Sequence, residues 1–334
     1  MAITLSFLLR TCLLTSLWCT GMCTIAGMAA VHPIDETPKK NHQQLYDKEP
    51  YVSTDSVYCI IPFSRAGNLI IIRAKADSIE GNFILDTGAP GLVLNSTYFR
   101  NFPTIETSIE ISGGLTGAAE NGGRTSITNF SFGPVKYSGV EADRIYMGHI
   151  ENNKGIQIHG LLGMQLFSHF EMIIDYEANL LHLHHISKKD GKNYKHPLLA
   201  DTSMYFEHNI EFIENKLITQ AWAGGKKLKF VIDTGAESNL LDSRLPDKVM
   251  DAVDITRRVI LNGAANKKVE ALSGNLGSIK IGQYDADNLP VVITNLEKLC
   301  YAYDKCLDGM LGFDFLSRQK IGFNFVKRKM YIWK

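Results

Sequence analysis

Short apolar runs alternate with polar, turn-forming stretches along most of the chain after residue 56. The runs are rich in Ile, Val, Phe and Thr and are bounded by Gly, Asn and Asp, a pattern typical of β-strands. No segment keeps a 3.6-residue apolar period over many turns, so little helix is expected. In the first half the pattern predicts strands at 57–63, 69–76, 82–85, 92–94, 125–132 and 135–142, a short helix within 96–101, a strand passing into a short helix at 160–170, and a closing hairpin at 171–184.

One apolar run occurs twice. Residues 83–89 read Phe-Ile-Leu-Asp-Thr-Gly-Ala, and residues 230–236 read Phe-Val-Ile-Asp-Thr-Gly-Ala. Further along the chain, 160–167 matches 309–316 at nearly the same offset. An internal repeat of this kind indicates a duplicated structural unit. The sequence therefore predicts an all-β protein of two similar lobes, each holding one Asp-Thr-Gly turn.

The N-terminus has the features of an export signal. Arg10 precedes a mostly apolar stretch over 11–25, and small residues follow it. The stretch is shorter than the ~20 residues that a membrane-spanning helix needs. We therefore expect residues 1–30 to be a signal peptide and the mature protein to be periplasmic or extracellular. A lipid anchor on Cys23 is the alternative, although Met22 before it is bulkier than such sites usually tolerate.

The other boundaries follow shifts in composition. Residues 31–55 are polar and lack periodicity, so we expect a flexible spacer there, with a short pro-segment as the alternative. Residues 188–203 are polar and contain turn formers, which predicts a linker between the lobes. The N-terminal lobe then spans 56–187 and the C-terminal lobe 204–334.

Composition limits the possible partners. The chain has 334 residues with 45% hydrophobic content, enough for two full cores. Its formal net charge is +0 and its basic runs are short, so nothing indicates a nucleic acid or an anionic membrane surface as partner. Both repeated aspartates lie in one polypeptide, and we expect a monomer.

The cysteines are consistent with an exported protein. Three of the six lie within the predicted signal peptide. Cys300 and Cys306 are close together in a predicted loop and are plausible disulfide partners; the alternative is two unrelated buried thiols. Cys59 is expected to be a small core residue.

Three histidines in the closing hairpin could suggest a metal site. His182 and His184 would share one strand face, with His185 beside them. No cysteine or carboxylate cluster has a matching spacing, and such a hairpin has an exposed face. We therefore expect surface histidines and predict no metal and no cofactor.

The two repeated aspartates are the candidate catalytic groups. A single Asp-Thr-Gly is a common turn, and an unpaired buried carboxylate is costly. Two carboxylates that meet across related lobes cannot both ionise easily, so they share one proton. The ionised one can take a proton from water, and the protonated one can polarise a carbonyl and later protonate a leaving nitrogen. Asp86 and Asp233 could thus hydrolyse an amide without a metal or cofactor.

The neighbouring residues fit this role. Gly88 and Gly235 permit tight turns that bring backbone N–H groups toward the carboxylates. Thr87 and Thr234 can cross-link the two turns through their hydroxyls. In each half a glycine after two apolar residues would let a strand pass close behind the turn, and these are Gly163 and Gly312.

On these motifs the chain resembles the superfamily of pepsin and the retroviral proteases. It looks most like bacterial exported aspartyl proteases with two retropepsin-like repeats in one chain. The resemblance covers about residues 57–334 and rests on residues 84–89, 161–163, 231–236 and 310–312. It implies two β-barrel lobes in a pepsin-like arrangement with a cleft between them, and hydrolysis of peptide bonds by Asp86 and Asp233.

The resemblance also implies a flap. The most glycine-dense region, 112–123, is flanked by β-type sequence and includes Gly113, Gly114 and Gly117. By the resemblance, this hairpin would close over an extended peptide; the alternative is an ordinary long surface hairpin.

Two departures from the family pattern affect the expected function. No tyrosine occurs between Ile111 and Thr128, where pepsin-like flaps carry one. Ala89 and Ala236 stand where Ser or Thr usually follows the glycine, which removes a hydroxyl that could stabilise the ionised carboxylates. We therefore expect a less acidic pH optimum than a pepsin-like enzyme has. The alternatives to an endopeptidase are a catalytically inactive peptide-binding module and a hydrolase of a non-protein amide.

Overall fold

The computed structural model describes residues 45–53, 57–105, 111–114, 117–119, 123–187, 196–213, 215–262, 268–298 and 306–334. Residues Gln44–Lys334 form one compact unit, in which β-strands are the main secondary structure. Among the described residues, no helix has the length and apolar character needed to cross a membrane.

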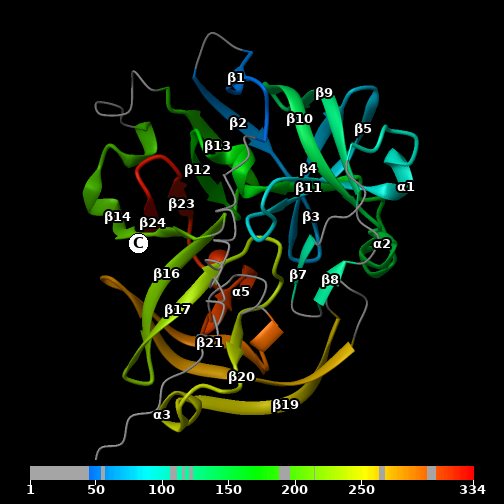
Figure 1. Cartoon of the computed structure of the whole chain (residues 1–334). Helices are drawn as coiled ribbons and strands as arrows, with labels where there is room; N and C mark the ends of the chain where they lie inside the picture. Colours follow the sequence, from blue (N-terminus) through cyan, green and yellow to red (C-terminus); the bar gives the residue numbers. More distant parts are fainter. Residues whose placement is uncertain are drawn as a thin grey trace, which may run out of the picture. The chain divides into compact units, whose positions relative to one another are not determined.

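Six strands of the first half close into a barrel (Figure 1). Around the ring the order is β4, β5, β11, β6, β10 and β9, and β9 pairs back to β4. Strands β1 and β3 extend its edges. The bounds are β1 Tyr51–Val52, β3 Ser64–Ala66, β4 Leu69–Ala76, β5 Ile79–Asp86, β6 Leu92–Asn95, β9 Gly123–Phe132, β10 Val135–Ile145 and β11 Gly160–Gly163.

The second half forms a similar ring. The order is β16, β17, β22, β18, β21 and β20, and the pairing of Trp222 with Lys280 joins β20 back to β16. Strands β15 and β19 extend this sheet. The bounds are β15 Glu211–Ile213, β16 Lys216–Ala223, β17 Lys226–Ile232, β18 Leu240–Asp242, β19 Val253–Asn262, β20 Lys268–Ile281, β21 Tyr284–Thr294 and β22 Gly309–Leu311.

A six-stranded sheet joins the two halves. Its order is β14, β24, β23, β12, β13 and β2, and in Figure 1 the green strands β12 and β13 lie beside the red strands β23 and β24. The halves meet where β12 pairs with β23, for example at Met172 and Phe323. The bounds are β2 Tyr58–Pro62, β12 Phe170–Asp175, β13 Leu180–His185, β14 Tyr205–Asn209, β23 Ile321–Asn324 and β24 Lys329–Trp333.

Helices are few and short, as the apolar pattern predicts. They cover one or two turns each and connect strands. The α-helices are α1 Ser96–Phe99, α2 Gly148–Lys154, α3 Asp247–Met250 and α5 Phe313–Leu316, and the 3-10 helices are η1 Met164–Phe167, η2 Pro197–Leu199 and η3 Thr202–Met204.

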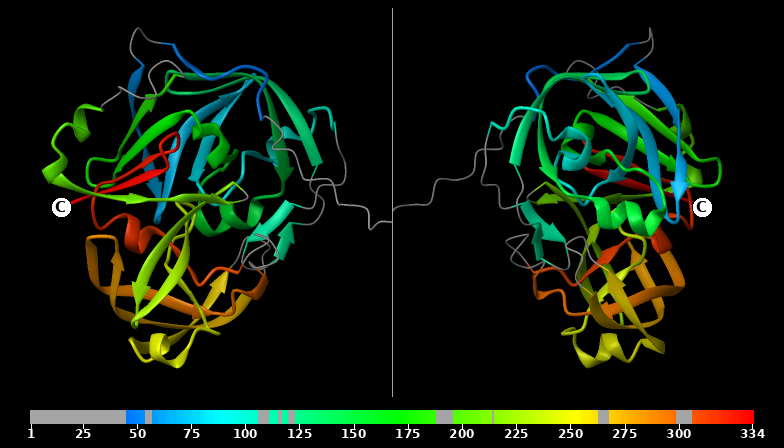
Figure 2. Two further views of the ribbon diagram at one scale, coloured as in Figure 1. Left: turned by 60° about the vertical axis from the view of Figure 1, so that its left-hand side comes forward. Right: turned by 90° about the vertical axis from the view of Figure 1, so that its right-hand side faces the viewer.

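The repeat in the sequence is also a repeat in strand pairing. Strand β11 runs parallel to β5 and antiparallel to β6, and β22 runs parallel to β17 and antiparallel to β18. Strand β10 runs parallel to β6 as β21 does to β18. The structure confirms the predicted all-β architecture of two related lobes, which both views in Figure 2 show.

Buried side chains from alternate strand positions fill both barrels. Phe83 and Leu85 of β5 are fully buried, and Phe230 and Ile232 of β17 take the matching places. Cys59 is a buried free thiol in the same core, as expected for a small core residue. The cores thus fix the two strands that end at the aspartates.

The segment before the first lobe differs from the expected flexible spacer. Tyr46 is buried, its ring lies 5.6 Å from that of Tyr137, and it forms a bridge with Val140. Strand β1 pairs with β10. Residues 45–53 are therefore part of the N-terminal lobe, because their few apolar side chains complete its barrel. Residues 31–44, the rest of the predicted spacer, lie outside the described residues.

The hairpin histidines also differ from expectation. His182 and His184 are each only 8% exposed. The Tyr58 hydroxyl lies 2.6 Å from His182 Nδ1, and the ring of His196 stands edge-on to that of Tyr58. These two residues cover the hairpin face that was expected to be open, so the prediction of surface histidines was wrong for His182 and His184.

Candidate active site

Strands β5 and β17 bring the two aspartates together. Asp86 is the last residue of β5, and Asp233 directly follows β17. The Asp233 carboxyl forms a side-chain hydrogen bond with the Asp86 carboxyl. Two residues far apart in the sequence thus form one pair at the junction of the lobes.

The threonines cross-link the two turns. The Thr87 N–H donates to Thr234 Oγ1 at 3.0 Å, and the Thr234 N–H donates to Thr87 Oγ1 at 3.0 Å. Each hydroxyl also donates to a backbone carbonyl of the opposite lobe, Thr87 to Ile232 at 2.9 Å and Thr234 to Leu85 at 2.8 Å. Both side chains are buried. Every polar group in this cross-link is therefore satisfied without water, which holds the turns in register.

The turn glycines make room for the opposite carboxylates. A Cβ added to Gly88 would lie 2.4 Å from Asp233 Oδ2, and one added to Gly235 would lie 2.6 Å from Asp86 Cγ. No side chain fits at such distances. Glycine is therefore required here by the close approach of the opposite carboxylate.

Backbone N–H groups hold one oxygen of each carboxylate. The Ala89 N–H donates to Asp86 Oδ1 at 3.0 Å, and the Gly235 N–H donates to Asp233 Oδ1 at 2.8 Å. Such bonds fix the carboxylate planes and favour negative charge. They are the contacts that the tight turns were expected to supply.

The glycines behind the turns are also sterically required. A Cβ on Gly163 would lie 2.1 Å from the Gly91 carbonyl oxygen, and one on Gly312 would lie 2.5 Å from that of Ala236. Strands β11 and β22 thus pass close behind the turns, as their Leu-Leu-Gly and Met-Leu-Gly sequences predict.

The pair is electrostatically coupled. Burial, and then the neighbouring Asp86 carboxyl, raise the pKa of Asp233 to about 8. The Gly235 N–H and Lys216 oppose this shift. The pair therefore keeps one proton at neutral pH, and the two carboxyls share it.

Comparisons with known proteins agree with this geometry. Residues 72–166 and 219–315, together more than half of the chain, match the sequence profile of a family described as aspartyl protease. The chain belongs to the aspartyl protease family. Each matched segment contains one Asp-Thr-Gly turn and the Gly163 or Gly312 motif of the same lobe.

One solved structure is similar to this chain over most of its length. It is the crystal structure of basic 7S globulin from soybean, with 10% sequence identity and a TM-score of 0.45. The alignment covers 83% of this chain and 94% of that chain. Among curated proteins, no match was found.

Sequence reasoning missed Lys216, the first residue of β16. Its side chain is only 4% exposed, and its ammonium donates a hydrogen bond to the carbonyl oxygen of Gly88 in the opposite lobe. Burial lowers the pKa of Lys216, while Asp86 and then Asp233 raise it. A lysine directly before the apolar pair Leu217-Ile218 of a predicted strand is the sequence signal that could have marked it.

A second inter-lobe contact lies at Glu237, next to the Asp233 turn. The Asn68 N–H donates to Glu237 Oε2 at 3.2 Å, and Lys154 of α2 forms an ion pair with the same carboxylate. The sequence offers no sign of this contact, because Glu237, Asn68 and Lys154 lie outside the repeated motifs.

The predicted flap corresponds to a hairpin in the N-terminal lobe. Strands β7 (Ile111–Gly114) and β8 (Gly117–Ala119) form a separate two-stranded sheet in which Gly114 pairs with Gly117. In Figures 1 and 2 this hairpin lies on the side of the N-terminal lobe that faces β19 and β20. Gly113 is part of β7; residues 115–116 and 120–122 lie outside the described residues.

One of the two cysteines of the predicted disulfide lies among the described residues. Cys306 is disulfide-bonded. Cys300 lies outside the described residues, so the pairing stays a prediction. Within the part of the chain that the structure describes, no group of three His, Cys, Asp or Glu is arranged to hold a metal ion.

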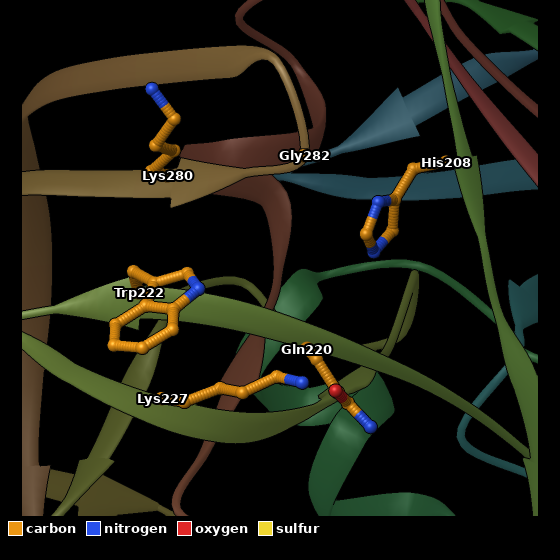
Figure 3. A pocket seen from close by; sticks show the side chains of 6 residues that line it. All are labelled: His208, Gln220, Trp222, Lys227, Lys280 and Gly282. Carbon is orange, nitrogen blue, oxygen red and sulfur yellow. The ribbon is translucent and has the colours of Figure 1, made fainter.

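A hollow of about 400 Å³ lies elsewhere on the C-terminal lobe (Figure 3). It sits where β16 meets β20, between Trp222 and Lys280, and His208 of β14 forms its far wall. Gln220, Lys227 and Gly282 complete the lining. Neither aspartate lines this hollow, so it is separate from the candidate active site.

Proposed function

We propose that this chain is an exported aspartic endopeptidase, which hydrolyses peptide bonds with a water molecule activated between Asp86 and Asp233. The observation that carries the proposal is the hydrogen-bonded pair of carboxyls on two turns cross-linked by Thr87 and Thr234. Membership of the aspartyl protease family supports the same chemistry.

We assign the acid role to Asp233, whose pKa is raised by burial and by the neighbouring Asp86 carboxyl, and the base role to Asp86. Asp86, as the carboxylate, accepts a proton from water while the water oxygen bonds to the peptide carbonyl carbon. Asp233 donates its proton to the carbonyl oxygen, which gives a neutral tetrahedral diol. Asp86, which is now the protonated member of the pair, then passes its proton to the peptide nitrogen as the C–N bond breaks. Asp233 regains a proton from the diol hydroxyl, and the pair returns to its starting state.

Substrate would bind across the turns as an extended peptide, and the β7–β8 hairpin would cover it. Two features of the hairpin support this role: it belongs to the N-terminal lobe, and its sequence is rich in glycine. The cleavage specificity would then depend on loops of both lobes.

Cleavage of a diverse peptide mixture tests the proposed activity. The purified protein is compared with Asp86→Asn and Asp233→Asn from about pH 3 to 8, and products are identified by mass spectrometry. Activity in the wild type that is lost in both variants supports the dyad. An inactive wild type that binds peptides as well as both variants do would establish the peptide-binding alternative instead.

Export is a separate part of the proposal. It rests on the apolar stretch after Arg10 and the small residues that follow. N-terminal sequencing of protein recovered outside the cytoplasm should find a start after Ala29 or Ala30. Recovery of the full-length chain from the cytoplasm alone would contradict it, and a lipid on Cys23 would show the anchored alternative.

A further inference from the structure

Lys216 breaks the symmetry of the candidate active site. Leu217 lies opposite Ile232, one residue before the Asp233 turn begins. In the N-terminal lobe Ile71 lies opposite Ile84, and continuing this register by one residue places Ile70 opposite Leu85. The N-terminal counterpart of Lys216 is therefore Leu69. Leu69 is buried in an apolar cluster with Ile71 and Ile84. One lobe thus places a hydrocarbon where the other places an ammonium group.

A buried ammonium needs partners. Isolated charge in a protein interior is strongly unfavourable unless it is hydrogen-bonded and paired. Lys216 meets this need at the dyad, with the Gly88 carbonyl as hydrogen-bond acceptor and the two aspartates as counter-charges. Of these two, Asp86 raises the pKa of Lys216 more than Asp233 does. Because electrostatic attraction is reciprocal, Lys216 favours negative charge on the pair, and it opposes the raised pKa of Asp233.

Two described carboxylates close to Lys216 or to the Asp233 turn in the sequence are engaged elsewhere. Strand β15 places Ile213 opposite Lys216, and its Glu211 accepts a hydrogen bond from Gln220 instead. Glu237, after the Asp233 turn, is bound by Asn68 and Lys154. Asp86 and Asp233, in contrast, both raise the pKa of Lys216.

We propose that Lys216 is a positioning residue for the dyad: it holds the Asp86 turn through the Gly88 carbonyl and, as a positive charge beside the pair, keeps one of the two carboxyls ionised when the medium becomes acidic. The inference rests on the proposed function, because it assigns a cause to the division of roles between the two carboxyls. Lys216 itself is not required to touch substrate.

The acid side of the pH profile is the measurement that tests this role. Removing a neighbouring positive charge makes a carboxyl easier to protonate, so in Lys216→Met the acid limb of kcat/KM should move up by about one pH unit. Lys216→Arg keeps the charge and should keep the limb near its wild-type position. Lys154→Met is the matched control, since it removes another inter-lobe lysine that pairs with Glu237, and its limb should not move.

A second readout separates this inference from the proposed activity. Titration of ¹³C-labelled aspartate carboxyls by NMR reports protonation of the pair in an inactive protein as well, with Asp86→Asn and Asp233→Asn used for assignment. Thermal unfolding of each variant shows whether it is folded. A folded Lys216→Met with an unmoved acid limb and unmoved carboxyl titration would overturn the role of Lys216, whatever the activity. If Lys216→Met does not fold, a limb that also moves upward in Lys216→Arg would overturn it.

Discussion

The Asp86 and Asp233 turns share their framework but differ in their charged surroundings. Both use a buried threonine, a glycine against the opposite carboxylate and a close strand behind. Within the described part of the chain, only the Asp86 turn accepts a hydrogen bond from an ammonium group of the other lobe, that of Lys216. The shared parts fix geometry and the unequal part biases charge, which suits a pair whose members must act as base and acid.

Among changes to the framework around the two aspartates, substitution of the turn glycines has the largest expected effect. Gly88→Ala or Gly235→Ala would push a methyl group into the opposite carboxylate, and a displacement of about 1 Å lowers kcat/KM by about 100-fold. Peptide cleavage rates measure this. Gly277→Ala is the control, because its Cβ would meet only the Ala252 carbonyl at 3.5 Å. A fully active variant at either turn would show that the carboxylates are not held as described.

The threonine cross-link should be equally important from both sides. Thr87→Val or Thr234→Val leaves a buried N–H and a buried carbonyl without partners, so each should lower the free energy of unfolding by roughly 2 kcal/mol or more. Denaturant unfolding of the two variants measures these losses. Serine at the same positions should restore most of the loss. Clearly unequal losses would contradict the symmetric framework.

The pH dependence sharpens the electrostatic difference. The pKa of Asp233 is raised to about 8 in the folded protein, so kcat/KM should fall as pH rises through that value. The folded state also holds this proton where the unfolded chain has lost it. The contribution of Asp233 to the free energy of unfolding is therefore fully present below about pH 4, the ordinary pKa range of an aspartate. It is lost as pH rises toward 8.

The loss of stability between about pH 4 and pH 8 can be measured from the unfolding temperatures of the wild type and Asp233→Asn. The wild type should lose stability relative to the variant as pH increases. Parallel curves would contradict the raised pKa, and an activity maximum near pH 2–3 would contradict the less acidic optimum expected from Ala89 and Ala236.

The Glu237 contact should give the smallest effect. Lys154 and Glu237 are 16% and 38% exposed in their side chains, and a partly exposed ion pair contributes about 1 kcal/mol or less. Lys154→Met should therefore lower the unfolding free energy only slightly and leave kcat/KM unchanged. A large loss of activity would mean that this contact also shapes the dyad.

The framework could be predicted from sequence because it is repeated. Two Asp-Thr-Gly turns and two strand motifs at a nearly constant offset define the lobes, and the chemistry of Thr87 and Gly88 follows from their residue types. The repeat could not reveal Lys216, since it has leucine as its counterpart and its burial depends on the opposite lobe. His182 is a similar case, because Tyr58 and His196 cover it from distant segments.

The most direct test of the shared dyad is a double-variant cycle in kcat/KM for a cleaved peptide, with Asp86→Asn, Asp233→Asn and the combined variant. Residues that act as one unit are strongly non-additive. The account predicts that each single variant loses about 10³-fold or more and that the combined variant loses no more than either. Losses that multiply in the combined variant, or substantial activity in one single variant, would contradict it.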